Sequence, residues 1–205
     1  IQIGILSDTH GQLVPYLFEY LQGVDHIIHA GDIGSESLIT ELEAIAPVTA
    51  VRGNTDHHLP DRFPLHAKVT VGEVTFWVTH IVDNPGHPPP SLQNSIEGSQ
   101  ATVVVFGHTH IPYMDLHGTI LYLNPGAAGP RRFNLPRTAC RMTLSTGGSQ
   151  ETTYQNLDSH TPYTHSCDGA LSIRPTGFIG SPSLLFRDKP LARVPNPQSE
   201  RPISP

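Results

Sequence analysis

Seven side chains able to bind a metal ion follow short apolar runs of this chain. They are carboxylates, imidazoles and one amide, and they occur in separate short segments rather than in one cluster. Isolated residues of these types are common, but their recurrence directly after predicted strands is not. Because ligands collect beyond the carboxyl ends of the strands in open α/β sheets, all seven can meet at one edge of a sheet. The candidates are Asp8, His10, Asp32, Asn54, His80, His108 and His110.

The spacing of these residues suits a pair of ions. Asp8 and His10 lie two residues apart in an extended exit from a strand, so their side chains project to the same side, and His108 and His110 repeat this spacing. The two carboxylate oxygens of Asp32 make it the natural bridge between two ions. Nitrogen and oxygen ligands without thiolates indicate Mn, Fe, Co, Ni or Zn rather than a structural zinc site built from cysteines.

Strands and helices alternate in the first third of the chain. The expected strands cover residues 1–6, 24–29 and 48–51, and the expected helices cover 14–21 and 37–45. Ser35 is the expected N-cap of the second helix. This alternation predicts βαβ units and a sheet with parallel strands.

The pattern changes to hairpins from residue 67 onward. We expect strands at 67–71, 74–79 and 102–106, a short helix at 91–97, a meander of strands at 112–116, 119–123 and 137–144, and a last strand at 150–154. The predicted fold class is therefore α/β, a four-layer αββα sandwich in which two mixed β-sheets are flanked by helices. Residues 1–156 form this domain.

The remaining residues, 157–205, are rich in proline and serine and poor in regularly spaced apolar residues. Such a segment buries too little surface to offset the entropy lost on ordering. We expect a tail that is disordered or loosely packed.

Composition limits the function further. A net charge of −6 with only 12 Lys and Arg residues argues against a broad nucleic-acid surface. A small anionic substrate stays compatible, because bound cations would dominate the local field. No apolar run approaches the roughly 20 residues of a membrane helix, and no signal peptide is evident. Cys140 and Cys167 make no disulfide framework, so we expect a cytoplasmic protein, subject to what an incomplete N-terminus would add.

The segments SDTHG, AGDIG, RGNTD, VTHIV and FGHTH resemble, in order and spacing, the motifs of the calcineurin-like metallophosphoesterases, and among them the small phosphodiesterases of the YfcE group. The resemblance covers nearly all of residues 1–155. It implies two divalent ions, Mn²⁺ before Fe, Co, Ni or Zn, and in-line attack on phosphorus by a hydroxide that bridges them. It also implies a small phosphorylated substrate, either a phosphodiester or an activated phosphomonoester.

Residue by residue, the resemblance assigns one ion to Asp8, His10, Asp32 and His110, and the other to Asp32, Asn54, His80 and His108. It implies that Asp32, Asn54 and His80 act in catalysis together with the bridging water. Each of these residues alone has an ordinary alternative role as a cap or a surface residue. The complete set in this order favours a metal site.

One departure from the family pattern concerns the leaving group. Many phosphatases of this family have a histidine where Thr55 stands here, and that imidazole protonates the leaving oxygen. Thr55 cannot act as a general acid near neutral pH. The enzyme should then favour substrates with good leaving groups, or the leaving group should receive its proton from water, His57 or His58. The two histidines are, however, more typical of ordinary loop residues.

Weaker signals give candidates for substrate binding and support. Arg52 and Arg131 could bind phosphate oxygens, although pairing with a neighbouring carboxylate or surface solvation is as ordinary a role. Asp56 fits a turn better than a role in orienting the site. His29 is a candidate partner of the metal-binding loops, and the segment 124–126 resembles a YfcE-group motif beside the metals.

A different class of function uses the same fold. A related retromer subunit is a non-catalytic scaffold for protein partners and has degraded metal ligands. All seven candidate ligands are intact in this chain, which favours catalysis over a scaffold.

Overall fold

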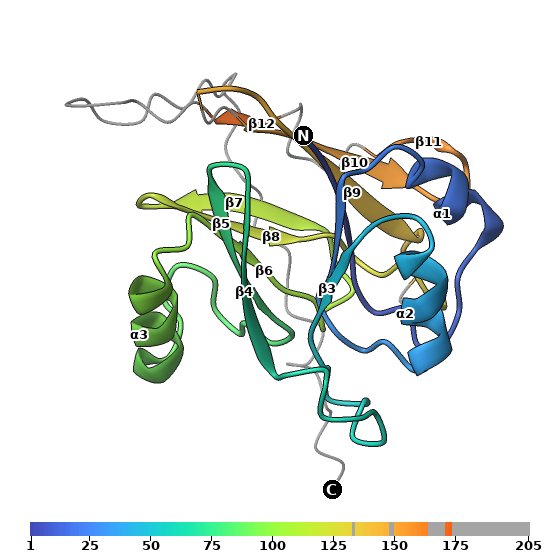
Figure 1. Cartoon of the computed structure of the whole chain (residues 1–205), viewed down its shortest axis with the longest axis horizontal. Helices are drawn as coiled ribbons and strands as arrows, with labels where there is room; N and C mark the ends of the chain where they lie inside the picture. The colour runs from blue at the N-terminus through green and yellow to red at the C-terminus, as the bar shows by residue number, and fades with distance from the viewer. Residues whose placement is uncertain (133, 148–149, 164–170, 174–205) are drawn as a thin grey trace, which may run out of the picture.

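Two β-sheets lie face to face in the computed structural model, which describes residues 1–132, 134–147, 150–163 and 171–173 (Figure 1). The part of the predicted tail beyond these ranges lies outside the described residues. The first sheet has the order β11-β10-β9-β1-β2-β3, with β12 also pairing with β10, and the second has the order β4-β5-β6-β8-β7.

Parallel strands form one half of the first sheet. β1 pairs with β2 and β2 with β3 in parallel register, whereas β9 lies antiparallel on the other side of β1. β10 continues the sheet antiparallel to β9, and β11 and β12 both pair with β10. The strands are β1 (Gln2–Leu6), β2 (His26–His29), β3 (Val48–Ala50), β9 (Thr138–Leu144), β10 (Gln150–Asn156), β11 (Thr161–Pro162) and β12 (Leu171–Ile173).

The second sheet also has a parallel centre. β5, β6 and β8 are parallel, and the antiparallel strands β4 and β7 form its two edges. Its strands are β4 (His66–Val71), β5 (Val74–Thr79), β6 (Val103–Val105), β7 (Tyr113–His117) and β8 (Ile120–Asn124).

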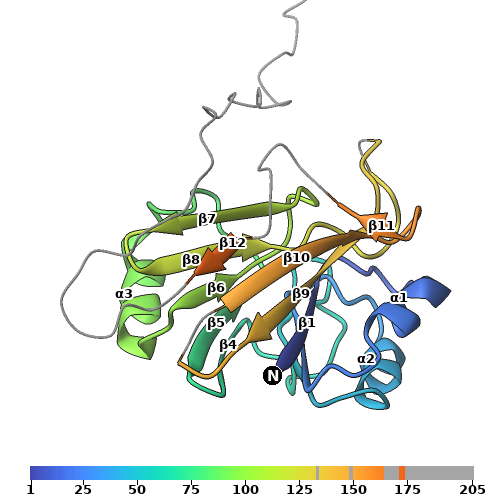
Figure 2. The same ribbon diagram turned by 90° about the horizontal axis from the view of Figure 1, so that it is seen from above.

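In the described part of the chain, three helices cover the outer faces of the sheets (Figures 1 and 2). α1 (Pro15–Tyr20) and α2 (Glu36–Glu43) pack on the first sheet, and α3 (Pro90–Ser99) packs on the second. The predicted cap of α2 is present, because the Ser35 hydroxyl accepts a hydrogen bond from the Leu38 backbone N–H at 3.4 Å. α1 and α3 begin at prolines, which suit the first turn of a helix.

Alternating side chains divide the apolar residues into three buried layers. Ile3 and Ile5 of β1 join Val103 and Val105 of β6 in the layer between the sheets. Leu6 faces the layer beneath α1 and α2, and residues such as Phe106 face the layer beneath α3. This is the four-layer αββα sandwich of two mixed sheets that the sequence predicts.

The predicted meander of three strands is wrong in its last member. β7 and β8 pair in the second sheet, but β9 belongs to the first sheet, antiparallel to β1. The apolar residues Cys140, Met142 and Leu144 alternate along β9 and could line the layer between the sheets from either sheet; in the structure they enter it from the first-sheet side. The connection between β8 and β9 therefore crosses from one sheet to the other, and the segment 124–126 lies where β8 ends and this connection begins.

Candidate metal centre

The seven candidate ligands converge at one edge of both sheets. Asp8 and His10 follow β1, Asp32 follows β2 and Asn54 follows β3, so the first sheet supplies four of them. The second sheet supplies the other three, since His80 follows β5, and His108 and His110 follow β6. Because the strands within each set are parallel, their carboxyl ends lie at the same edge.

One group of ligand atoms joins the two sheets. Asp8 Oδ1 lies 3.2 Å from His110 Nε2, and His10 Nε2 lies 3.4 Å from the same nitrogen. One ligand atom from each of these three residues lies within 4.8 Å of the others, which is close enough to surround a single cation.

A second group lies beside the first. Asp8, Asp32 and His80 also offer atoms within 4.8 Å of one another. Asn54 Oδ1 lies 3.1 Å from His80 Nε2 and 2.9 Å from His108 Nδ1. Asn54, His80 and His108 lie on three different loops, and their donor atoms thus lie close to one another.

The Asp32 carboxylate lies between His10 and His80. Its Oδ2 lies 3.7 Å from His10 Nε2, and its Oδ1 lies 3.5 Å from His80 Nε2. The Thr55 backbone N–H donates to Oδ1 at 2.9 Å and fixes the orientation of the carboxylate. One oxygen therefore faces each histidine group, which is the arrangement that a bridging ligand needs.

Unpaired buried atoms show that a cation fits here. Asp8 is fully buried, yet its Oδ1 has no hydrogen-bond partner among the described residues, and the same is true of His110 Nδ1. A buried carboxylate oxygen without a donor is costly, because it has lost its hydration without compensation. A cation beside Asp8 Oδ1 would supply the missing partner.

The backbone of the ligand loops is unusual. Eight non-glycine residues of the described chain have positive φ, and five of them are candidate ligands. Left-handed backbone in such residues is uncommon and tends to cluster at functional sites. Hydrogen bonds between the loops hold them together, among them Asp8 N–H to Gly31 O, His10 N–H to Asp32 O, and His108 N–H to Asp8 Oδ2. The five residues are Asp8, His10, Asp32, His108 and His110.

Glycines allow the loops to approach this closely. A Cβ at Gly53 would lie 2.1 Å from Asp32 Oδ1, and one at Gly107 would lie 2.0 Å from Ser7 Oγ and 2.7 Å from Asp8 Oδ2. Any larger residue at either position would displace a candidate ligand. The glycines of the G-N and G-H segments are therefore required for close packing around the carboxylates.

His29 supports the loops that follow β1 and β2. The Gly31 backbone N–H donates to Nδ1 at 3.2 Å, so Nε2 carries the proton and donates to the Thr9 hydroxyl at 2.8 Å. That hydroxyl in turn donates to the Ile33 carbonyl at 3.0 Å. Complete burial lowers the pKa of His29 to about 4, which keeps the ring neutral. The structure thus gives His29 the supporting position that the sequence suggests.

Asp56 has a larger structural role than the expected turn. Its Oδ2 accepts hydrogen bonds from the backbone N–H groups of Ile33 and Gly53, and its Oδ1 accepts one from Gly34, each at 2.9 Å. This buried carboxylate ties the loop of Asp32 to the loop of Asn54. Its place in the G-N-T-D segment was the only sequence signal for this role.

Asn124 holds the loop after β6 in place. Its amide nitrogen donates to the Gly107 carbonyl at 2.8 Å and the Thr109 hydroxyl at 3.1 Å, and its oxygen accepts from the Gly126 N–H at 2.9 Å. The segment 124–126 therefore positions the loop that carries His108 and His110.

Burial and charge adjust the ligands in opposite directions. Burial lowers the pKa of His10, against the attraction of Asp32, and the positive charge of Arg132 adds to this lowering. Burial alone would lower the pKa of His80 as well, but the hydrogen bond with Asp32 and the nearby carboxylates outweigh it and raise the pKa. Burial likewise opposes the lowered pKa of Asp32, which His80 and the Thr55 N–H produce.

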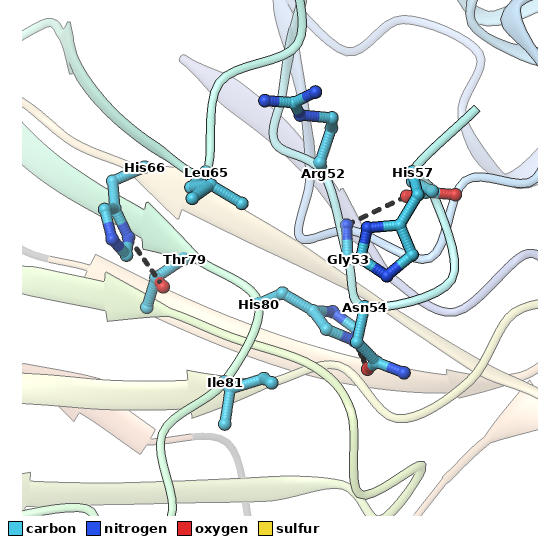
Figure 3. A pocket seen from close by; sticks show the side chains of 10 residues that line it. Arg52, Gly53, Asn54, His57, Leu65, His66, Thr79, His80 and Ile81 are labelled. Carbon is cyan, nitrogen blue, oxygen red and sulfur yellow. Dashed lines mark hydrogen bonds between the residues drawn. The ribbon is translucent and has the colours of Figure 1, made fainter. Parts of the chain in front are cut away.

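A pocket of about 500 Å³ opens beside Asn54 and His80 (Figure 3). Arg52 and His57 contribute to its lining, whereas Arg131 does not and instead pairs with Asp158 at 2.9 Å. His58 Nε2 lies 3.0 Å from the Gly34 carbonyl, so it is engaged in the loop structure. Of the two arginine candidates, Arg52 is therefore the one that lines this pocket.

Comparisons with known proteins give the chain its relatives. It is 31% identical over 139 residues to a probable metallophosphoesterase of Methanothermobacter thermautotrophicus, which spans 65% of this chain and 81% of that protein. It is 30% identical over 147 residues to the phosphodiesterase YfcE of Escherichia coli, which spans 59% of this chain and 76% of that protein.

In the described part of the chain, no helix has the length and apolar character needed to cross a membrane.

The fold has solved counterparts. The structure of vacuolar protein sorting 29 from Cryptosporidium parvum matches with a TM-score of 0.69 and 21% identity, over 84% of this chain and 97% of that one. Residues 1–147 match the family model of the calcineurin-like phosphoesterase superfamily domain. With the five motifs gathered at one edge of the two sheets, the chain belongs to the calcineurin-like phosphoesterase superfamily.

Proposed function

We propose that this chain is a dinuclear metal-dependent phosphoesterase that hydrolyses phosphodiesters or activated phosphomonoesters. The observation that carries the proposal is the position of Asp32, whose two oxygens face His10 on one side and His80 on the other. The names of the relatives, a probable metallophosphoesterase and a phosphodiesterase, support the same class of reaction.

The proposed assignment divides the donors into two ligand sets that share Asp32, whereas Asp8 is the residue common to both groups of close-lying atoms. The second group uses His80 through Nε2, because Nδ1 donates to the Ala30 carbonyl at 2.7 Å and so fixes the ring. Mn²⁺ is the proposed metal, with Fe, Co, Ni and Zn as alternatives for the same donors. The first ion is assigned to Asp8, His10, Asp32 and His110, and the second to Asp32, Asn54, His80 and His108.

Two bound divalent ions would supply a hydroxide for in-line attack and neutralise charge on the phosphate. Asp32, Asn54 and His80 keep the reacting groups in place, through the contacts of 3.5 and 3.1 Å that His80 makes with the other two. Arg52 is close enough to the same pocket to bind an oxygen of the substrate. Arg131 is the weaker candidate, because Asp158 already pairs with it.

The leaving group receives little help from Thr55. A hydroxyl cannot act as a general acid near neutral pH, so the proposed enzyme should hydrolyse esters with good leaving groups faster than alkyl esters. Small phosphorylated compounds in the cytoplasm are the proposed substrates.

Hydrolysis of bis(4-nitrophenyl) phosphate and of 4-nitrophenyl phosphate tests the proposal. We expect release of 4-nitrophenolate that requires Mn²⁺, stops with a chelator, and falls by at least about 100-fold in Asp32→Asn, because one shared ligand holds both ions. Ile1→Ser, a change at an exposed residue before β1, is the control and should keep full activity.

The alternative is a non-catalytic scaffold on the same fold. Equal rates with Mn²⁺ and with chelator, or equal rates in wild type and Asp32→Asn, would favour that alternative over the enzyme.

A further inference from the structure

The pocket beside Asn54 and His80 has an apolar wall that faces solvent. Leu65 is 59% exposed and Ile81 is 39% exposed, and both line the pocket. Within the described residues only one other large hydrophobic side chain is exposed, and that residue is Ile1. In the view of Figure 3, Leu65 lies above His80 and Ile81 lies below it. Exposed apolar side chains that line one pocket are typical of a ligand-binding surface.

A cationic group lies in the same pocket. The Nε of Arg52 is buried and has no hydrogen-bond partner among the described residues. Its Nη1 lies 3.3 Å from Asp61, but the side chain of Asp61 is completely exposed, so this ion pair holds the guanidinium only weakly. The outer end of the guanidinium, which only this weak ion pair holds, is therefore the part of Arg52 that can donate to an acceptor on a ligand.

The pocket is continuous with the proposed metal centre, because Asn54 and His80 belong to its lining. A phosphate held at those two residues would have an ester substituent beside the apolar wall. The size of the pocket, about 500 Å³, is in the range of small-molecule sites and exceeds what a methyl group needs.

We propose that this pocket binds one ester group of a phosphodiester, a bulky apolar or aromatic group whose apolar face contacts Leu65 and Ile81 and whose acceptor oxygen binds Arg52. This inference rests on the proposed function and narrows it to diesters with a large substituent. Phosphomonoesters of small alcohols leave the apolar wall uncovered and are poorer substrates.

The chain contains its own reporter for this pocket. Trp77 is the single tryptophan, and its ring stacks on His66 with centroids 5.8 Å apart and 21° between the planes. His66 lines the pocket and is fixed by a 2.9 Å contact between Nδ1 and the Thr79 hydroxyl. A ligand that contacts His66 should change the fluorescence of Trp77.

The test is a fluorescence titration of Mn²⁺-loaded protein with diphenylphosphinate and dimethylphosphinate. Both ligands have P–C bonds in place of ester bonds and cannot be hydrolysed, so binding is measured without turnover. We expect diphenylphosphinate to bind at least about tenfold more tightly, which corresponds to burial of some tens of Å² of apolar surface per ring. In Leu65→Ser/Ile81→Ser this preference should fall to about twofold or less.

Matched variants make the result specific. Ile1→Ser removes the third exposed hydrophobic side chain and should keep the preference. Leu65→Ser and Ile81→Ser alone should each lose part of it, and they serve if the double variant does not fold. Arg52→Met should raise the KM for bis(4-nitrophenyl) phosphate, whose nitro oxygens are acceptors, about fivefold with kcat within about twofold.

Equal binding of the two phosphinates by wild type, or a preference that persists in the double variant, would overturn the inference. An unchanged KM in Arg52→Met would remove Arg52 from it. Failure of the proposed function has a separate signature, the absence of Mn²⁺-dependent hydrolysis in the same wild-type preparation. If the protein is active but shows no preference for the phenyl ligand, the proposed phosphoesterase function stands and only the proposed role of the pocket is rejected.

Discussion

Asp8 and Asp32 combine three properties that seldom occur together in one residue. They are buried, their backbones are left-handed, and their carboxylates lie among histidine nitrogens. Each property is costly alone, through lost hydration or backbone strain. Their coincidence is understandable if the surrounding structure holds the carboxylates in place for a cation.

His29 gives a prediction about pH and stability. The folded protein keeps this ring neutral down to the folded pKa of about 4, whereas the unfolded chain binds a proton below about 6.5. The unfolded state is therefore favoured increasingly as the pH falls from 6.5 to 4, and this residue alone should cost about 3 kcal/mol of stability.

Denaturant unfolding of wild type and His29→Gln between pH 7 and pH 4 measures this effect. The variant lacks the titrating ring, so its stability should fall less steeply over that range. Parallel curves for the two proteins would show that His29 is not the group responsible.

The sequence was enough to predict that the candidate ligands meet, but not which residues support their loops. The candidates occur in short motifs directly after strands, so the strand pattern alone places them at one edge of the sheets. The pairing of Arg131 with Asp158 joins positions 27 residues apart, and a sequence without a fold gives no reason to prefer it over a phosphate contact. For the same reason the three backbone contacts of Asp56 could not be foreseen, because two of them lie on another loop.

At the scale of elements, the loops are held by a carboxylate that accepts from backbone N–H groups and by an amide that donates to a backbone carbonyl. Asp56 connects the loops after β2 and β3, and Asn124 holds the loop after β6. The strands set which loops are neighbours, and these side chains fix how the neighbours lie.

Asp56→Ala tests this arrangement. The change leaves three backbone donors, those of Ile33, Gly34 and Gly53, without their acceptor, so we expect a loss of unfolding free energy on the order of 3 kcal/mol. Metal affinity should fall too, because the loops of Asp32 and Asn54 lose their connection. Asp83→Ala, at an exposed aspartate, is the control for a lost carboxylate and should change neither quantity in chemical denaturation and calorimetric titration with Mn²⁺.

The layer architecture followed from sequence periodicity, but strand partnership did not. Alternation of strand and helix in the first third predicted β1, β2 and β3 correctly as a parallel set. β9 was assigned to the wrong sheet because its alternating apolar residues fit the space between the sheets from either side. Only the path of the loop between β8 and β9 decides the partner, and that path depends on tertiary contacts.

At the scale of the whole molecule, metal binding should stabilise the fold. A ligand that binds only the folded state adds about 2.7 kcal/mol at a concentration 100 times its Kd. We therefore expect Mn²⁺ to raise the Tm by several degrees, as measured by calorimetry, and a chelator to reverse the rise.

Asp32→Asn should show little of this increase, since its carboxylate is assigned to both ions. A Tm that responds equally to Mn²⁺ in both proteins would place the bound ion elsewhere on the molecule.

Four of the candidate ligands come from the first sheet and three from the second. A partly folded chain in which only one sheet has formed would hold at most an incomplete set of donors. The ions would therefore link the two sheets. They would bind late in folding, after the two sheets have packed against each other. Loading with metal would then report on the completed tertiary structure, and slow exchange of the ions would measure how rarely the two halves separate.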